Sequence, residues 1–185
     1  MDGKITYSRR KSLSLRIAPD GSLDIRAPIG MPRREIDRFL EEKADWIATH
    51  RAQVLRDRQQ GALHAIGAEQ LETLKELARE SIYESLRRFA PQMGVNYGRV
   101  TIRCQKSRWG SCSSAGNLNF NCLLALAPRE VLDYVVVHEL AHRLHMDHSA
   151  AFWQEVEKVL PDYRVCRHWL RQNGGALLAR TGENG

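Results

Sequence analysis

Residues 135–149, VVVHELAHRLHMDHS, join an apolar run to four histidines, one glutamate and one aspartate. Within them, His138 and His142 are four positions apart and Glu139 follows the first, which is the pattern HExxH. Four residues of a helix turn through about 400° and rise about 6 Å, so the two imidazoles lie on one face, one turn apart. They can therefore bind one Zn²⁺ together. Glu139 is offset from that face, which suits a base that acts on a metal-activated water.

A catalytic zinc ion usually takes three protein ligands and keeps a fourth position for water, so a third ligand is needed. His145 follows His142 by three positions, and on a continuing helix it would rise about 4.5 Å further and miss the metal. A turn at residues 146–147 would instead bring His148 back toward the pair. Glu155, on the next predicted helix, is the other candidate. We favour His148 as the third ligand and expect His145 to have a structural role.

The spacing of apolar residues predicts both helices and strands around this motif. Helical spacing predicts helices over residues 32–58, 69–89, 149–160 and 162–172, and one more that begins at Pro128 and carries HExxH. Alternation with period two predicts an antiparallel β-hairpin over residues 4–27 and a second antiparallel pair over residues 98–106 and 117–126. The chain is therefore predicted to be an α+β protein.

We expect three regions along the chain. An N-terminal β-hairpin and helix occupy residues 1–60, a core occupies residues 61–173, and residues 174–185 form a flexible tail. Residues 59–68, QQGALHAIGA, interrupt the helical pattern and are predicted to be a short linker.

The composition is that of a globular protein, with 185 residues of which 43% are hydrophobic and 27% charged. No window approaches the roughly 18 consecutive apolar residues of a membrane span, and the N-terminal residues contain no apolar segment typical of a secretory signal. We therefore expect a cytoplasmic protein with no membrane partner. The four cysteines form no CxxC pair, and their spacing matches no zinc ribbon or finger. In a secreted chain they could form two disulfides, but since no secretory signal is recognised we expect reduced, mostly buried thiols at Cys104, Cys112, Cys122 and Cys166.

The formal net charge is +6, and the chain contains 22 arginines against 6 lysines. Guanidinium groups suit phosphates and carboxylates, so this excess is compatible with an anionic partner such as a nucleotide or a nucleic acid. No block of like charge exceeds three residues, however, which favours an ordinary solvated surface.

Three short motifs accompany the histidines. They are Arg108–Cys112 (RWGSC), Asp133–Val136 (DYVV) leading into HExxH, and Asp147–Ser149 (DHS) followed by Phe152 and Trp153. In this combination the chain resembles the YgjP-like metallopeptidase family, which is also called a domain of unknown function. The strong similarity covers roughly residues 100–172.

The resemblance implies a minimal zincin-like core, in which a short antiparallel sheet accompanies the HExxH helix, as in the related SprT-like and WLM metallopeptidases. It implies that His138, His142 and His148 bind zinc and that Glu139 is the general acid/base. In such an enzyme Zn²⁺ polarises the carbonyl of a peptide or protein substrate, and Glu139 takes a proton from the water and passes it to the leaving amine.

Three further residues are candidates for contacts with the substrate. Arg108 and Trp109 lie in a loop rich in glycine and serine, where they can contact the substrate or stabilise an oxyanion, or else form an ion pair and pack. An extended peptide would lie along an edge strand. We predict that Asn117–Leu123, which contains Asn119, is this strand.

Two other functions are compatible with the same motif. One is a metal-dependent nucleoside triphosphate pyrophosphatase, an activity to which some members of the resembled family have been linked. The other is a nucleic-acid-associated module with a structural zinc ion. A structural zinc site usually has four protein ligands, and a phosphohydrolase should need Mg²⁺ or Mn²⁺ with arginines or lysines facing the metal.

Overall fold

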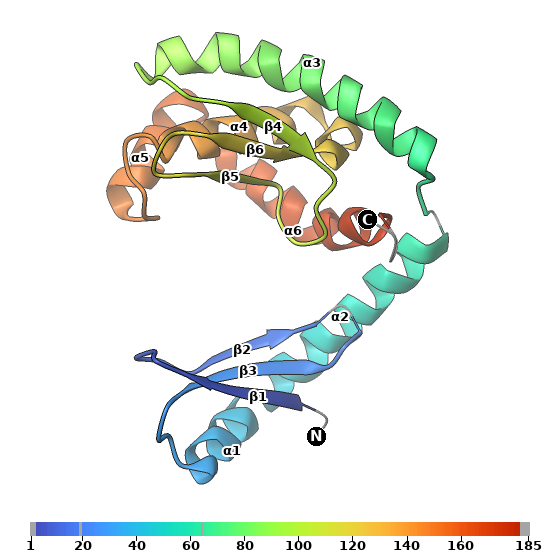
Figure 1. Ribbon diagram of the computed structural model, residues 1–185, viewed down its shortest axis with the longest axis vertical. Coiled ribbons are helices and arrows are strands. Elements are labelled where there is room, and N and C mark those ends of the chain that lie inside the picture. Colours follow the sequence, from blue (N-terminus) through green and yellow to red (C-terminus); the bar gives the residue numbers. More distant parts are fainter. Residues whose placement is uncertain (1–2, 19, 64, 182–185) are drawn as a thin grey trace. The chain divides into compact units, whose positions relative to one another are not determined.

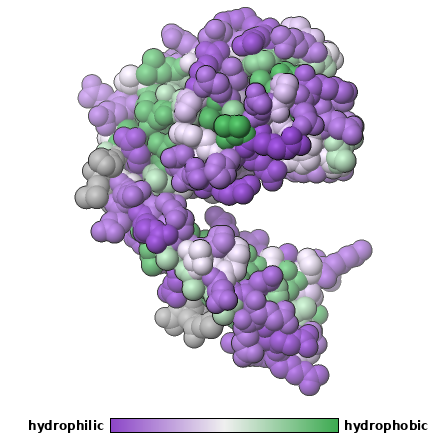
Figure 2. Space-filling view, turned by 180° about the vertical axis from the view of Figure 1, so that it is seen from behind, coloured by the Kyte–Doolittle hydropathy of each residue, from purple (hydrophilic) through white to green (hydrophobic). Residues whose placement is uncertain are grey.

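The computed structural model describes residues 3–18, 20–63 and 65–181, and the chain divides into two compact units, Met1–Leu63 and His64–Gly185 (Figure 1). Each unit combines helices with a small mixed sheet, which confirms the predicted α+β class. Hydrophilic side chains cover most of the face seen in Figure 2. Within the described ranges, no helix is long and apolar enough to cross a membrane.

A three-stranded sheet forms the first half of the N-terminal unit. Its strands are β1 (Gly3–Ser8), β2 (Ser14–Ile17) and β3 (Leu23–Pro28), in the order β1-β3-β2. Strands β2 and β3 form the predicted antiparallel hairpin. Strand β1 pairs parallel with β3 and adds a strand that the sequence did not predict. Alternate residues of β3 are buried, so one face of the sheet contributes to the core of this unit.

Two helices complete the N-terminal unit. They are α1 (Arg33–Glu42) and α2 (Ala44–Leu63), and they replace the single predicted helix over residues 32–58 because the chain turns at Lys43. Helix α2 continues to Leu63, so the first half of the predicted linker at 59–68 is helical. The buried core of this unit comprises Leu23, Ile25, Ala27, Ile36, Leu40 and Ile47.

The second unit contains a mixed sheet with the order β4-β6-β5, which lies under helix α3 (Ala68–Gln92) in the view of Figure 1. Its strands are β4 (Val100–Arg103), β5 (Gly110–Cys112) and β6 (Leu118–Asn121). Strand β4 pairs parallel with β6, so the predicted antiparallel pairing of these two segments is wrong. The cause is β5, which forms inside the predicted loop, pairs antiparallel with β6 and reverses the chain a second time.

A short 3-10 helix and three α-helices follow the sheet. They are η1 (Cys122–Leu126), α4 (Arg129–Ala141), α5 (Ala150–Val159) and α6 (Tyr163–Ala179). The flexible tail predicted at 174–185 is therefore helical as far as Ala179, and residues 182–185 lie outside the described residues. Gly174 lets α6 approach Trp109 closely, since a Cβ atom there would lie 3.1 Å from Nε1 of the Trp109 ring.

Helix α4 is the centre of the second unit. It contacts α3, α5, α6, β5 and η1, and it lies behind the sheet in Figure 1. A helix surrounded in this way must be apolar on most of its circumference, which explains the valine run before the first histidine. Its buried apolar residues are Val131, Leu132, Tyr134, Val135, Val136, Val137, Leu140 and Ala141.

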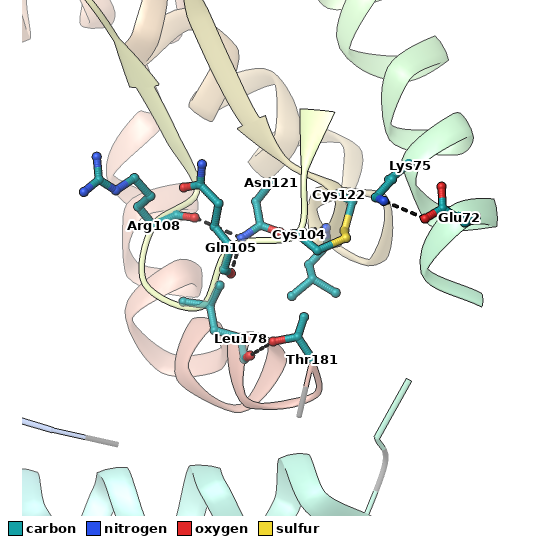
Figure 3. Close-up of a disulfide and its surroundings, with 10 residues drawn as sticks. Glu72, Lys75, Cys104, Gln105, Arg108, Asn121, Cys122, Leu178 and Thr181 are labelled. Carbon is teal, nitrogen blue, oxygen red and sulfur yellow. Dashed lines mark hydrogen bonds and ion pairs between the residues drawn. A yellow bond between two sulfur atoms is a disulfide. The ribbon is translucent and has the colours of Figure 1, made fainter. Parts of the chain in front are cut away.

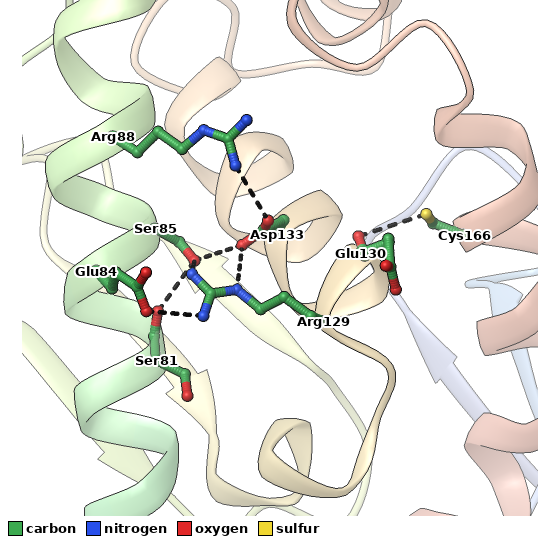
Figure 4. Close-up of polar contacts among 8 residues, drawn as sticks. All are labelled: Ser81, Glu84, Ser85, Arg88, Arg129, Glu130, Asp133 and Cys166. Atoms are coloured by element: carbon green, nitrogen blue, oxygen red, sulfur yellow. Dashed lines mark hydrogen bonds and ion pairs between the residues drawn. The ribbon is translucent and has the colours of Figure 1, made fainter.

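A buried carboxylate attaches α4 to α3 (Figure 4). Asp133, which is 7% exposed, accepts hydrogen bonds from Ser85 Oγ at 2.5 Å and from Arg129 Nε at 3.0 Å. The same guanidinium donates to Ser85 Oγ at 3.2 Å and to Glu84 Oε2 at 2.8 Å. Asp133 therefore links the first turns of α4 to the middle of α3 and does not orient a histidine.

Replacing Asp133 with alanine should lower the free energy of unfolding by about 2–4 kcal/mol, because it removes the buried acceptor of the Ser85 hydroxyl and of the Arg129 guanidinium. Urea unfolding followed by circular dichroism measures this change. Glu84→Gln is the matched control, since the exposed Glu84 binds the same guanidinium from the solvent side and its loss should matter little. Equal effects of the two substitutions would contradict the assigned role of Asp133.

A disulfide joins Cys104 to Cys122, beside the loop that leads to β5 (Figure 3). The parallel register pairs Arg103 with Asn121, so the next residue of each segment lies opposite the other, with 5.3 Å between the two Cα atoms. That separation is typical of a disulfide. The expectation of four reduced thiols is therefore wrong for this pair, and Cys112 and Cys166 are free.

Reduction of this disulfide should lower the free energy of unfolding by about 3 kcal/mol, because the bond closes a segment of 18 residues in the unfolded chain. Urea titrations of the wild type with and without a reductant measure the difference. A Cys104→Ala variant is the control and should unfold at the same urea concentration under both conditions. If the free energy of unfolding of the wild type does not change when the reductant is added, the result would argue against the disulfide.

Candidate metal centre

The last turn of α4 presents two imidazoles on the same face. The ring centroids of His138 and His142 lie 5.1 Å apart, as their spacing of four residues predicts. The helix ends at Ala141 with His142 as its C-cap, which is earlier than the predicted turn at 146–147. His145 is thus beyond the helix, and its backbone amide still bonds to the carbonyl oxygen of Ala141 at 3.0 Å.

The loop after α4 is held by a single guanidinium. Arg143 donates from Nε to the carbonyl oxygen of Asn96 at 2.9 Å and from Nη1 to that of Ser114 at 3.4 Å. Gly116, at φ +80°, leaves the space for this side chain, since a Cβ there would lie 2.8 Å from Arg143 Cζ. The loop therefore has a fixed starting point beside the sheet.

The end of the same loop brings a third imidazole to the pair. Asp147 Oδ1 accepts a hydrogen bond from the amide of Ser149 at 3.2 Å, just before α5 begins. His148 Nε2 then lies 3.1 Å from His138 Nε2. Each of His138, His142 and His148 offers one nitrogen, and these three nitrogens lie within 4.8 Å of one another.

One pair of these nitrogens has the spacing of two ligands of a zinc ion. Two nitrogens bonded at 2.0–2.1 Å to one tetrahedral zinc ion are about 3.3 Å apart, and the Nε2 atoms of His138 and His148 are 3.1 Å apart. His142 Nδ1 donates to the carbonyl oxygen of His145 at 3.1 Å, which leaves Nε2 of His142 unprotonated and able to bind a metal. His145 thus contributes its backbone, in keeping with a structural role.

Burial also keeps the histidines in the form that binds metals. Burial, followed by the neighbouring His142 and His148, lowers the pKa of His138 to about 3. Burial likewise lowers the pKa of His142. His138 and His142 are therefore neutral at neutral pH, and neutral imidazoles can bind a metal without first releasing a proton.

Aromatic side chains pack against the three rings. The ring of Phe152, which is fully buried, lies 4.9, 4.7 and 4.8 Å from those of His138, His142 and His148 respectively. Trp153 lies 5.8 Å from the ring of His138. Nδ1 of His138 is buried and has no hydrogen-bond partner among the described residues, so no hydrogen bond at this nitrogen orients the ring.

A buried carboxylate lies beside the imidazoles. Glu139 is 5% exposed, and burial raises the pKa of its carboxyl group to about 8, while the charge of Arg108 acts in the opposite direction. A carboxyl group with such a pKa can exchange protons near neutral pH. Three histidines together with a carboxyl group of this kind have the composition of a hydrolytic metal site.

Strand β5 approaches this carboxylate through a glycine. A Cβ atom at Gly110 would lie 2.5 Å from Oε1 of Glu139 and 2.9 Å from its Cδ. Because Gly110 has no side chain, the carboxylate of Glu139 can occupy the space beside strand β5. We did not single out Gly110 from the sequence, although a glycine within a strand often indicates the close approach of another group.

The three predicted substrate-binding residues occupy different positions in the structure. Arg108 is exposed and lies two residues before strand β5, whose Gly110 contacts Glu139. Trp109 is partly buried and packs against Gly174 of α6, so it contributes to the core. Asn119 lies on β6, which is the central strand of its sheet, so the predicted edge strand at 117–123 is wrong.

The strand register also places Asn119 away from the carboxylate. Phe120 pairs with Gly110, and Asn119 pairs with Ser111, to whose Oγ its Nδ2 donates at 3.4 Å. Cross-strand partners share a face of the sheet and successive residues alternate. Since Gly110 faces Glu139, Asn119 lies on the opposite face. Glu155, the other candidate ligand, pairs with Lys158 at 2.7 Å and is not part of the histidine group.

Three comparisons with known proteins bear on the family of this chain. No curated protein matches the chain. The crystal structure of the metallopeptidase zymogen of Pyrococcus abyssi abylysin is similar, with 26% sequence identity and a TM-score of 0.44 over 49% of this chain and 93% of that one. The YgjP-like, metallopeptidase domain matches residues 11–71 and 57–173, which include the HExxH helix and His148. The chain therefore belongs to the YgjP-like metallopeptidase family.

Proposed function

We propose that the protein is a zinc-dependent metallopeptidase that hydrolyses peptide bonds. In this proposal His138, His142 and His148 bind the zinc ion, and Glu139 is the general acid/base. The observation that carries the proposal is the meeting of three imidazole nitrogens within 4.8 Å, together with the burial of Glu139, the residue after His138, which is 5% exposed. Membership of a metallopeptidase family supports a divalent metal and a peptide or protein substrate.

The number and the kind of ligands favour a catalytic zinc ion. Among the residues that the structure describes, the group contains three histidines, and three protein ligands leave a fourth position for water. This disfavours the structural zinc ion of a nucleic-acid-associated module. Imidazole nitrogens suit zinc, whereas Mg²⁺ prefers oxygen ligands, so the site gives no support to the pyrophosphatase alternative.

In peptide hydrolysis the metal site and Glu139 would have different roles. Zinc in this position would polarise the peptide carbonyl and lower the pKa of a water molecule. Glu139 accepts a proton from the water molecule on one of its two carboxylate oxygens, of which Oε1 faces Gly110. It then delivers this proton to the leaving amine. Burial holds the pKa of this group near the range in which both transfers are efficient.

Strand β5 is the candidate binding site for the substrate backbone. It is an edge strand in the order β4-β6-β5, and its Gly110 contacts Glu139. An extended peptide that pairs with β5 would place its scissile bond next to this carboxylate.

The disulfide bears on the cellular compartment. A bond between Cys104 and Cys122 is typical of oxidising compartments and does not favour the predicted cytoplasmic location.

Metal analysis with a peptidase assay tests the proposal. Wild-type protein purified without chelators should contain one zinc ion per chain by mass spectrometry. His148→Ala should lose the metal, and the matched control Glu155→Ala should keep it, because Glu155 pairs with Lys158 outside the group. Glu139→Gln should keep zinc and lose about 10²- to 10⁴-fold in kcat. Zinc that persists in His148→Ala, or full activity in Glu139→Gln, would refute the assigned roles.

Gly110→Ala should lower kcat by about 10- to 100-fold without loss of zinc, because the new methyl group displaces the carboxylate of Glu139 from its position. Peptide hydrolysis and zinc content are measured on the same preparation. Ser111→Ala is the matched control, since it changes the next residue of β5, whose side chain faces away from Glu139. An unchanged kcat in Gly110→Ala would show that Glu139 does not depend on this close approach.

A further inference from the structure

Two exposed arginines lie on segments that contact the histidine helix or its neighbours. Arg108 precedes β5 by two residues, and Gly110 of that strand is in contact with Glu139. Arg108 therefore belongs to the segment that leads directly to the contact with the general base, on the side of the sheet.

The second arginine approaches from helix α6. The guanidinium carbon of Arg167 lies 4.7 Å from the ring centroid of Trp153, a cation–π contact. The same ring lies 5.8 Å from that of His138 and 5.9 Å from that of His148. The ring of Trp153 therefore lies between the Arg167 guanidinium and two of the proposed ligands, on the side of α5 and α6.

Neither arginine is neutralised by an acidic residue. The neighbouring charges are paired with each other, as in Glu155 with Lys158 and Glu157 with Arg164, each at 2.7 Å. In the ranges that the structure describes, neither Arg108 nor Arg167 takes part in an ion pair, although both are exposed. Their charges therefore remain available to a molecule that occupies the site.

We propose that this site selects peptides that carry carboxylates close to the scissile bond, with Arg108 receiving one carboxylate and Arg167 another. The inference rests on the proposed peptidase function and adds the chemical class of its substrate. A planar guanidinium binds a carboxylate through two parallel hydrogen bonds. The carboxylate can belong to an aspartate or glutamate side chain or to the C-terminus of the substrate, and the chemistry of recognition is the same.

Binding to the inactive but zinc-loaded Glu139→Gln variant tests the inference without turnover. The probes are fluorescein-labelled peptides with aspartate or glutamate on both sides of a central bond, and isosteric peptides with asparagine or glutamine there. Fluorescence anisotropy should give a dissociation constant about 5- to 20-fold lower for the acidic peptide at low salt. The difference should shrink as the ionic strength rises, because salt screens charges at an exposed site.

Arginine variants show which residues are responsible. Arg108→Gln and Arg167→Gln, each in the Glu139→Gln background, should weaken binding of the acidic peptide by about 5-fold and leave the amide peptide nearly unchanged. Arg103→Gln is the matched control: Arg103 is exposed, ends β4 at the opposite edge of the sheet from β5, and takes part in no ion pair within the described ranges. It should change neither dissociation constant by more than about 2-fold.

The source of the carboxylate is distinguished by two further peptides. Loss of affinity on amidating the C-terminus of the acidic peptide would assign the carboxylate to the chain end. Loss of affinity only on replacing the side chains would assign it to aspartate or glutamate. Either outcome supports recognition of a carboxylate by these arginines.

Cleavage by the zinc-loaded wild type separates this inference from the function on which it rests. A higher kcat/KM for the acidic peptide than for its amide counterpart supports both. Equal kcat/KM and equal dissociation constants would overturn the selectivity and leave the peptidase proposal in place. Failure to cleave any peptide of the series would overturn the peptidase proposal and this inference with it.

Discussion

The burial of helix α4 is the constraint on which the second unit depends. Its valine run is apolar around the whole helix, so α3, α5, α6 and the sheet must all pack against it. The same helix carries Asp133, Glu139 and His142 into the interior, where polar groups are costly unless they are satisfied. Asp133 is satisfied by Ser85 and Arg129. The other two are gathered at the C-terminal end, where a metal ion would satisfy the imidazole.

Local spacing explains what could be predicted from the sequence. The positions of His138 and His142 on one face follow from helix geometry alone. The pairing of β4 with β6 depends instead on how many times the chain reverses between them, and three residues of β5 decide that. The disulfide was missed for the same reason, because its cysteines become neighbours only in the parallel register.

Side-chain roles at the site were predictable only in part. Aromatic residues near the histidines suggest packing from sequence alone, and Phe152 does lie against all three rings. The contacts of Trp109 with Gly174 and of Gly110 with Glu139 join segments far apart in the chain, and no periodic pattern encodes such contacts. Membership of the family supports a metal-dependent peptidase in general, and the particular roles come from these local arrangements.

The three imidazoles differ in how firmly each is held. His138 and His142 belong to the end of a buried helix, whereas His148 is exposed and comes from a loop. A metal ion would therefore meet two fixed donors on the protein side and one solvent-facing donor. Exchange of the ion would proceed by release of the loop donor while the helix stays folded. The lifetime of the bound ion would then be governed by the motion of a few loop residues and not by unfolding of the domain.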